Sequence, residues 1–153
     1  PIAVAEPTNF TARGGMQVGS CLAGISFLKG LGLVHAISHM IGAEFNTHHG
    51  LTNAIILPVV LRFNLPGMDD KVRRMAEAMQ LPDHSVNGFI NSVEVLLDEI
   101  AIPKSLSEIG VTVECTERIA GKALKDSAAR TNPRIATLAE VQALTETAIT
   151  KAR

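Results

Sequence analysis

The sequence contains no tryptophan and no tyrosine, and five phenylalanines are its only members of the Phe, Trp and Tyr class. Proteins that bind single-stranded nucleic acid usually stack bases on such rings. Excess positive charge is missing as well, since 14 basic residues stand against 15 acidic ones for a net charge of −1. Nucleic-acid-binding domains concentrate lysine and arginine. The composition therefore argues against a nucleic-acid partner.

Long apolar runs are also missing. No segment reaches the roughly 18 consecutive apolar residues that a membrane-spanning helix needs, so we expect no membrane partner. The start of the chain has no charged, apolar and small-residue sequence of the kind that directs secretion, and we expect a cytoplasmic protein. The chain opens at Pro1 without an initiator methionine. We interpret it as a piece of a longer protein.

Cysteine is scarce. Cys21 and Cys115 make neither a disulfide framework nor a zinc motif. Cys21 lies among Leu22, Ala23 and Ile25, and a small thiol in such surroundings is usually buried. We expect Cys21 in the core.

A helical period of apolar residues runs through nearly the whole chain, and no segment alternates like a strand. The 153 residues suffice for one domain. Glycines at 30, 32 and 42 predict helix ends, and the pairs Ser105/Glu108 and Thr137/Glu140 read as capping boxes. The predicted helices span about 11–29, 33–41, 50–63, 69–80, 86–100 and 114–128, with a last one from Thr137. The predicted fold class is all-α, a helical bundle.

The segment from about Gly50 to Phe63 is apolar on almost every side, which is typical of a helix in the middle of a bundle. Pro58 lies inside it and should kink it or shift its boundary.

Four of the five histidines fall between positions 35 and 49. His35 and His39 are four apart, so on a helix their rings project from one face. His49 follows across a turn that contains Gly42 and Asn46. Imidazole is the commonest protein ligand of zinc- and iron-type metals. Histidines in apolar helices are also often hydrogen-bonded core residues, but this density in so short a segment favours a metal or catalytic site.

A longer pattern surrounds these histidines. Residues 30–39 (GLGLVHAISH), His49-Gly50, Asn53-Ala54 and Leu57-Pro58 resemble the signature of the iron-containing (group III) alcohol dehydrogenases. Downstream, residues 102–111 resemble the family's Pro-x-x-Leu-x-x-x-Gly segment, and residues 126–134 resemble its Asn-Pro-Arg loop. The resemblance extends from about Arg13 to the end. It implies the dehydroquinate synthase-like α domain of these enzymes, with residues 1–153 as a partial C-terminal metal-binding domain.

In that family one aspartate and three histidines hold the metal, and the resemblance implies that His35 and His49 are the last two of these ligands. His39 matches a group beside the nicotinamide and the substrate, for which we expect a catalytic role. A hydrogen bond to a ligand is its alternative. His48 departs from the proline common at its position, so the choice between His48 and His49 rests on Gly50, which favours His49. Phe27 lies near the family's aromatic pocket residue, or packs in the core.

Other parts of the family pattern do not occur in these residues. The Asp-x-x-x-His motif is missing, and so is the glycine-rich turn of the N-terminal α/β nucleotide domain. Arg13-Gly14-Gly15 is no substitute because it follows no strand. The resemblance implies Fe²⁺ or Zn²⁺ as the metal, and NAD or NADP bound mainly by the missing N-terminal domain. It implies a small alcohol or aldehyde substrate and a homo-oligomer, and we expect the fragment alone to be inactive.

Two alternatives stay open. The first is a non-catalytic metal-binding or scaffolding bundle, which needs only the residues present. The second is a metal-independent reductase of the same fold, which should lack the ligands.

A missing ligand-bearing helix also has a structural consequence. We expect one side of the helix at 51–61, including Ile55, Ile56, Val59 and Val60, to be uncovered within the chain, with His35 and His49 at the rim of that face.

Overall fold

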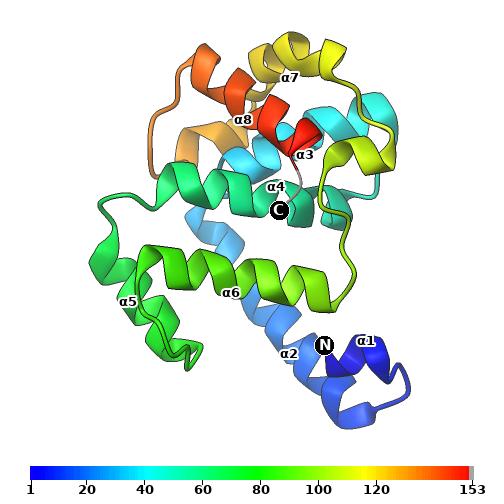
Figure 1. Cartoon of the computed structure of the whole chain (residues 1–153), viewed down its shortest axis with the longest axis vertical. Coiled ribbons are helices and arrows are strands. Elements are labelled where there is room, and N and C mark those ends of the chain that lie inside the picture. The colour runs from blue at the N-terminus through cyan, green and yellow to red at the C-terminus, as the bar shows by residue number, and fades with distance from the viewer. Residues whose placement is uncertain (152–153) are drawn as a thin grey trace.

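The computed structural model describes residues 1–151, and all regular structure in this range is helical, which confirms the predicted all-α class (Figure 1). The α-helices are α1 (Ile2–Ala5), α2 (Phe10–Ser26), α3 (Leu33–Phe45), α4 (His49–Asn64), α5 (Asp69–Ala78), α6 (Val86–Glu99), α7 (Thr116–Ala123) and α8 (Leu138–Thr150). Short 3-10 helices are η1 (Phe27–Lys29), η2 (Leu106–Ile109), η3 (Val113–Cys115) and η4 (Ser127–Thr131).

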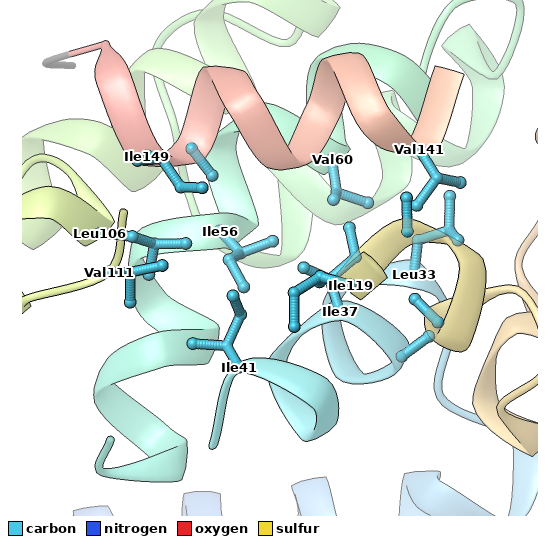
Figure 2. Close-up of a cluster of buried hydrophobic side chains, with 14 of the residues drawn as sticks. Leu33, Ile37, Ile41, Ile56, Val60, Leu106, Val111, Ile119, Val141 and Ile149 are labelled. Carbon is cyan, nitrogen blue, oxygen red and sulfur yellow. The ribbon is translucent and has the colours of Figure 1, made fainter. Parts of the chain in front are cut away.

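The main core lies among α3, α4, α7 and α8. Leu33, Ile37 and Ile41 on α3 are spaced by four residues, so they form one stripe that is fully buried. Figure 2 shows this stripe facing Ile56 of α4 and Ile119 of α7. Each buried side chain of this size contributes about 1.5–3 kcal/mol relative to an exposed one. This packing fixes the opposite flank of α3, where His35 and His39 lie.

α4 is the central helix, packed against α3, α6 and α8. Ile55, Ile56 and Val60 are at most 2% exposed, and Val59 is half-buried. The expectation that this side of α4 is uncovered within the chain was therefore wrong. α3, α6 and α8 cover these residues between them. Pro58 lies inside α4, and the bounds of the helix, His49–Asn64, are within one residue of the predicted 50–63, so the proline does not shift them.

The turn between α3 and α4 differs from the prediction at Gly42. α3 continues through Gly42 to Phe45, and Asn46 ends it in the left-handed conformation (φ 52°) with its N–H donating to the Gly42 carbonyl. A glycine late in a helix is tolerated at a cost of about 1 kcal/mol, so it does not by itself set the end. Asparagine is the non-glycine residue that most readily adopts this conformation.

The start of α3 is held by a distant loop. Gly32 has φ 122° and no side chain with which to cap α3, and the Leu33 N–H instead donates to Asn132 Oδ1 at 3.1 Å. Asn132 also exchanges two amide hydrogen bonds with Asn64 at the end of α4. Gly30 (φ 92°) lies so close to Thr131 that a Cβ would overlap its side chain. The Asn-Pro-Arg loop thus fixes α3 relative to α4.

A second, smaller core joins α5 and α6 to the end of α4. Leu65, Val72, Ala76, Phe89 and Ile90 are its buried members. Here the helical periods at 69–80 and 86–100 predicted the elements to within two residues.

The segment predicted as one helix at 114–128 is divided. η3 precedes α7, α7 ends at Ala123, and η4 follows. Asp126 separates them because its backbone is extended and its carboxylate caps η4 by accepting from the Ala128 N–H at 2.7 Å. Both predicted capping boxes are present.

α2 runs out from the body, with α1 folded back on it (Figure 1). None of its 17 residues is buried. Cys21 is exposed, so the expectation of a core thiol was wrong. The apolar residues that α1, α2 and the segment after them leave exposed are Ile2, Val4, Phe10, Met16, Val18, Leu22, Ile25, Phe27, Leu28 and Leu31. The large uncovered apolar surface therefore lies on α2, not on α4.

Within residues 1–151 no single helix is both long and apolar enough to cross a membrane. Phe10–Lys29 and Leu33–Phe45 meet that test only when taken together, and they are bent by 103° at their junction.

Candidate metal centre

The flank of α3 opposite the core carries two histidines one turn apart. The ring centroids of His35 and His39 are 5.8 Å apart, and both rings are half-buried. Because the core stripe of α3 is fixed by packing, the direction in which these two rings project is fixed as well.

The two histidines that begin α4 have different roles. His48 is the N-cap residue, and its Nδ1 accepts a hydrogen bond from the Leu51 N–H at 3.3 Å. His49 is the first helical residue, and its ring lies 5.3 Å from His35 and 5.5 Å from His39, centroid to centroid. The geometry therefore places His49, not His48, beside the α3 histidines. His49 is exposed.

The Nε2 atoms of His35 and His49 face a common point. The side-chain nitrogen of Asn53 lies 3.3 Å from His35 Nε2 and 3.0 Å from His49 Nε2. The other end of this amide, Asn53 Oδ1, is buried and has no hydrogen-bond partner. The amide nitrogen thus lies between the Nε2 atoms of two imidazoles, and the amide oxygen is left without a partner. A point that two imidazole nitrogens face in this way suits a cation. The residues present fit a divalent metal held by two imidazoles.

His39 is oriented by a carboxylate from the far end of the chain. Its Nδ1 lies 3.1 Å from Asp126 Oδ2, on the segment between α7 and η4. Burial acts to raise the pKa of Asp126, but the hydrogen bonds from the Ala128 N–H and from His39 outweigh it, and the net pKa is lowered. An ionised carboxylate only accepts, so His39 donates to it through an Nδ1 proton, and in the neutral form of the ring the unprotonated nitrogen is then Nε2.

Burial lowers the pKa of His35, and repulsion from His49 and His39 lowers it further against the opposing attraction of Asp126. His35 is therefore neutral at neutral pH. Neutral imidazole is the form that binds a metal.

Across residues 1–151, no three histidine, cysteine, aspartate or glutamate side chains are arranged to hold a metal ion among themselves. His39 accordingly lies near His35 and His49 without joining them in such a group. Two imidazoles alone would leave positions on a metal ion open for other ligands.

Phe27 lies beside the histidine cluster. The Phe27 ring stands edge-on to His35, with centroids 5.8 Å apart, and it is 55% exposed. It therefore borders the histidines and is not part of the core. His84 lies exposed in the loop before α6.

A groove of about 520 Å³ lies elsewhere, between α4, α6 and α8. Pro58 and Val59 are among its lining residues, and the Arg62–Glu94 ion pair at 2.9 Å borders it. No histidine lines it, so it does not belong to the metal centre.

Sequence reasoning missed the roles of Asp126 and Asn53. Asp126 is 87 residues from His39, and no local pattern connects the two. Asn53 had a detectable signal, because it lies four residues after His49 and so must share its helix face.

Comparison with known proteins identifies the family of the chain. Residues 1–149 match the family model for the C-terminal part of the Fe-containing alcohol dehydrogenase family. The chain belongs to this family. The resemblance predicted from the histidine segment is thereby confirmed.

Its similar proteins are alcohol dehydrogenases and reductases. The chain is 36% identical over 145 residues to a probable alcohol dehydrogenase, EutG, of Escherichia coli, covering 94% of this chain and 37% of that protein. It is 37% identical to the lactaldehyde reductase of the same organism, covering 87% and 37%. A solved 1,3-propanediol oxidoreductase superposes with a TM-score of 0.92 at 34% identity, covering 96% and 40%.

The chain thus spans about two fifths of the length of these relatives. It corresponds to the helical C-terminal domain of the iron-containing alcohol dehydrogenases.

Proposed function

We propose that this chain supplies two of the protein ligands, His35 Nε2 and His49 Nε2, for a divalent metal in an alcohol dehydrogenase that uses NAD or NADP. The observation that carries the proposal is the common point faced by these two nitrogens, with Asn53 Nδ2 within 3.3 Å of both. Family membership supports the reaction class. The NAD-dependent methanol dehydrogenase of Bacillus methanolicus, 33% identical over 159 residues, supports the nicotinamide cofactor.

A bound metal would act as a Lewis acid on the alcohol oxygen. His35 and His49 would hold it through their Nε2 atoms, whose positions are set by the α3 core stripe and by the start of α4. The remaining aspartate and histidine ligands come, as the resemblance implies, from an Asp-x-x-x-His helix outside these residues. Fe²⁺ is the metal that the family name favours, and Zn²⁺ suits the same imidazoles.

His39 is proposed as the catalytic group beside the metal. Asp126 holds its proton on Nδ1, so Nε2 can accept the proton that leaves the alcohol. The exposed fraction of the His39 side chain, 36%, gives that proton a route toward solvent. The nicotinamide cofactor itself performs the hydride chemistry, and we propose that the nucleotide is bound mainly by a domain outside this chain.

Small substrates fit this proposal. The relatives are named for lactaldehyde, methanol and 1-propanol, and Phe27 beside His35 would form an apolar wall of a small pocket.

The test is alcohol oxidation by the longer protein, loaded with iron under anaerobic conditions, with NAD and with NADP. His49→Ala should lower the rate by more than the roughly 10–100-fold typical of residues behind the ligands, while His84→Ala should leave it unchanged. The 153-residue chain alone should show no turnover. Turnover by that chain, abolished in His49→Ala, would show that the cofactor site lies within these 153 residues. The proposal that another domain binds the nucleotide would then be wrong.

A further inference from the structure

Asn53 lies one turn after His49 on α4, so its side chain shares the face that His49 presents to α3. Its Nδ2 is 3.0 Å from His49 Nε2 and 3.3 Å from His35 Nε2. One amide group therefore bridges both proposed ligands. It does so through the ring nitrogen that each would offer a metal.

The donor inventory settles which nitrogens carry protons. A carboxamide nitrogen has two hydrogens and accepts nothing. With the amide in this orientation each Nε2 accepts, and a neutral ring that accepts at Nε2 carries its proton on Nδ1. Turning the amide around would bring its oxygen to the rings but bury two N–H donors without partners, in place of the single unpaired oxygen present now. Unpaired buried donors each cost about 1–3 kcal/mol, so the bridging orientation is preferred.

We propose that Asn53 is the positioning residue of the metal centre: its amide fixes His35 and His49 in the Nδ1–H tautomer and holds the metal position until the metal displaces it. The displacement half of this proposal rests on the proposed function. The tautomer half rests on hydrogen-bond geometry alone.

Displacement follows from distances. A metal bound at about 2.1 Å along the same two Nε2 directions that the amide nitrogen now occupies would overlap Asn53 Nδ2, which lies 3.0 and 3.3 Å from those nitrogens. The amide would then have to rotate away. The rotation breaks two hydrogen bonds to neutral rings but frees Asn53 Oδ1 to find a partner. Because both lone pairs already face the site, no ring proton has to leave when the metal binds.

His39 provides an internal reference. Asp126 fixes its proton on Nδ1 independently of Asn53, so its tautomer should not respond to substitution at position 53.

The experiment is ¹⁵N NMR of the imidazole rings in the metal-free chain at about pH 9, well above the ordinary histidine pKa. The wild type should show His35, His49 and His39 all as Nδ1–H tautomers. Asn53→Asp replaces the donor with an acceptor, and at least one of His35 and His49 should change to Nε2–H. Asn53→Leu, which cannot hydrogen-bond, should give mixed tautomers for both. Asn91→Asp, on the exposed side of α6, is the matched control and should change nothing.

A Zn²⁺ titration followed on the same ring signals separates the two proposals. Wild-type Nε2 signals of His35 and His49 should shift together, and Asn53→Leu should weaken the apparent affinity by about tenfold or more. Nε2–H tautomers in the wild type, or no response to Asn53→Asp, would overturn the role of Asn53 even if His49→Ala abolishes Zn²⁺ binding. Zn²⁺ binding that is unaffected by His49→Ala would instead overturn the metal site, and with it the displacement half.

Discussion

His48 and His49 are adjacent and chemically identical, yet their surroundings assign them separate tasks. The His48 ring caps α4 through Nδ1, and the His49 ring faces His35. The sequence favoured His49 only through the glycine that follows. The contacts give the physical reason, because the His48 ring is engaged with the Leu51 N–H of its own helix, whereas the His49 ring lies against His35 and His39.

This difference predicts that substitution of His48 mainly affects stability and substitution of His49 mainly affects metal binding. His48→Ala should lower the free energy of unfolding by about 0.5–2 kcal/mol, as loss of an N-cap does, and leave Zn²⁺ affinity unchanged. His49→Ala should abolish Zn²⁺ binding at this centre with a smaller effect on unfolding. Urea denaturation and metal titration of both variants measure the two effects, and loss of metal binding in His48→Ala alone would reverse the assignment.

A second residue-scale prediction concerns Glu44 on α3, which forms an ion pair with Arg118 on α7. The hydrogen bond from Arg118 lowers the pKa of Glu44, and the attraction of the same guanidinium adds to it against some burial. A carboxylate whose pKa is lower in the folded than in the unfolded state stabilises the fold at pH values above its unfolded-state pKa. This stabilisation is lost as the pH falls through its folded-state pKa.

The difference in unfolding free energy between wild type and Glu44→Gln should therefore be largest near neutral pH and shrink below about pH 4.5. Glu117→Gln, an exposed carboxylate on α7, serves as the control. A difference that stays constant down to pH 3 would show that the ion pair does not couple α3 to α7.

Contacts within the site could be predicted from the sequence only where the two residues lie close together along the chain. His35 and His39 were recoverable because helical spacing places them on one face. The pairing of His39 with Asp126 was not, because it depends on how α7 and η4 pack across 87 residues. Asn53 was visible in the pattern as a residue, but its bridging role depends on the angle at which α3 meets α4.

At the scale of elements, helix existence was predictable and helix ends were not. The apolar period located α5 and α6 well because their buried faces are simple stripes. The predicted end of α3 was wrong because Asn46, not Gly42, ends the helix. The segment 114–128 was predicted as one helix because apolar periodicity does not reveal the cap that Asp126 forms between α7 and η4.

Asn132 links these elements, since it caps α3 at the Leu33 N–H and pairs with Asn64 of α4. Asn132→Ala should lower the free energy of unfolding by about 1–3 kcal/mol, combining a lost cap with an unpaired amide. Asn91→Ala, an exposed asparagine on α6, should change it by less than about 0.5 kcal/mol. Thermal or urea unfolding compares them, and equal effects would mean that the Asn-Pro-Arg loop does not hold α3 and α4 together.

At the scale of the molecule, the sequence correctly indicated that apolar surface would be left uncovered but assigned it to the wrong helix. α4 was expected to have an uncovered side because it is apolar all round, whereas α3, α6 and α8 cover it. The segment predicted as a helix at 11–29 has apolar residues near the helical period, yet no residue of α2 is buried. Periodicity reports which residues are apolar, and only the packing shows which of them find a neighbour.

Exposed apolar surface of this extent promotes association. We predict that the 153-residue chain self-associates through α2 at micromolar concentration. Leu22→Glu, at a residue that is 62% exposed, should reduce the average molecular mass measured by analytical ultracentrifugation. Val95→Glu changes a residue of similar exposure, 57%, that lies on α6 away from this surface, and should leave the mass unchanged. An equal reduction in mass for both variants would show that α2 is not the surface through which the chain self-associates.

The central claim is that His35 and His49 share one metal, and anomalous diffraction tests it most directly. Crystals of the longer protein loaded with Fe²⁺ or Zn²⁺, measured on both sides of the metal absorption edge, should give one anomalous peak about 2.1 Å from the Nε2 atoms of both residues, with the Asn53 amide turned out of that position. A peak at His48 or His84, or metal bound by only one of the two rings, would contradict the account.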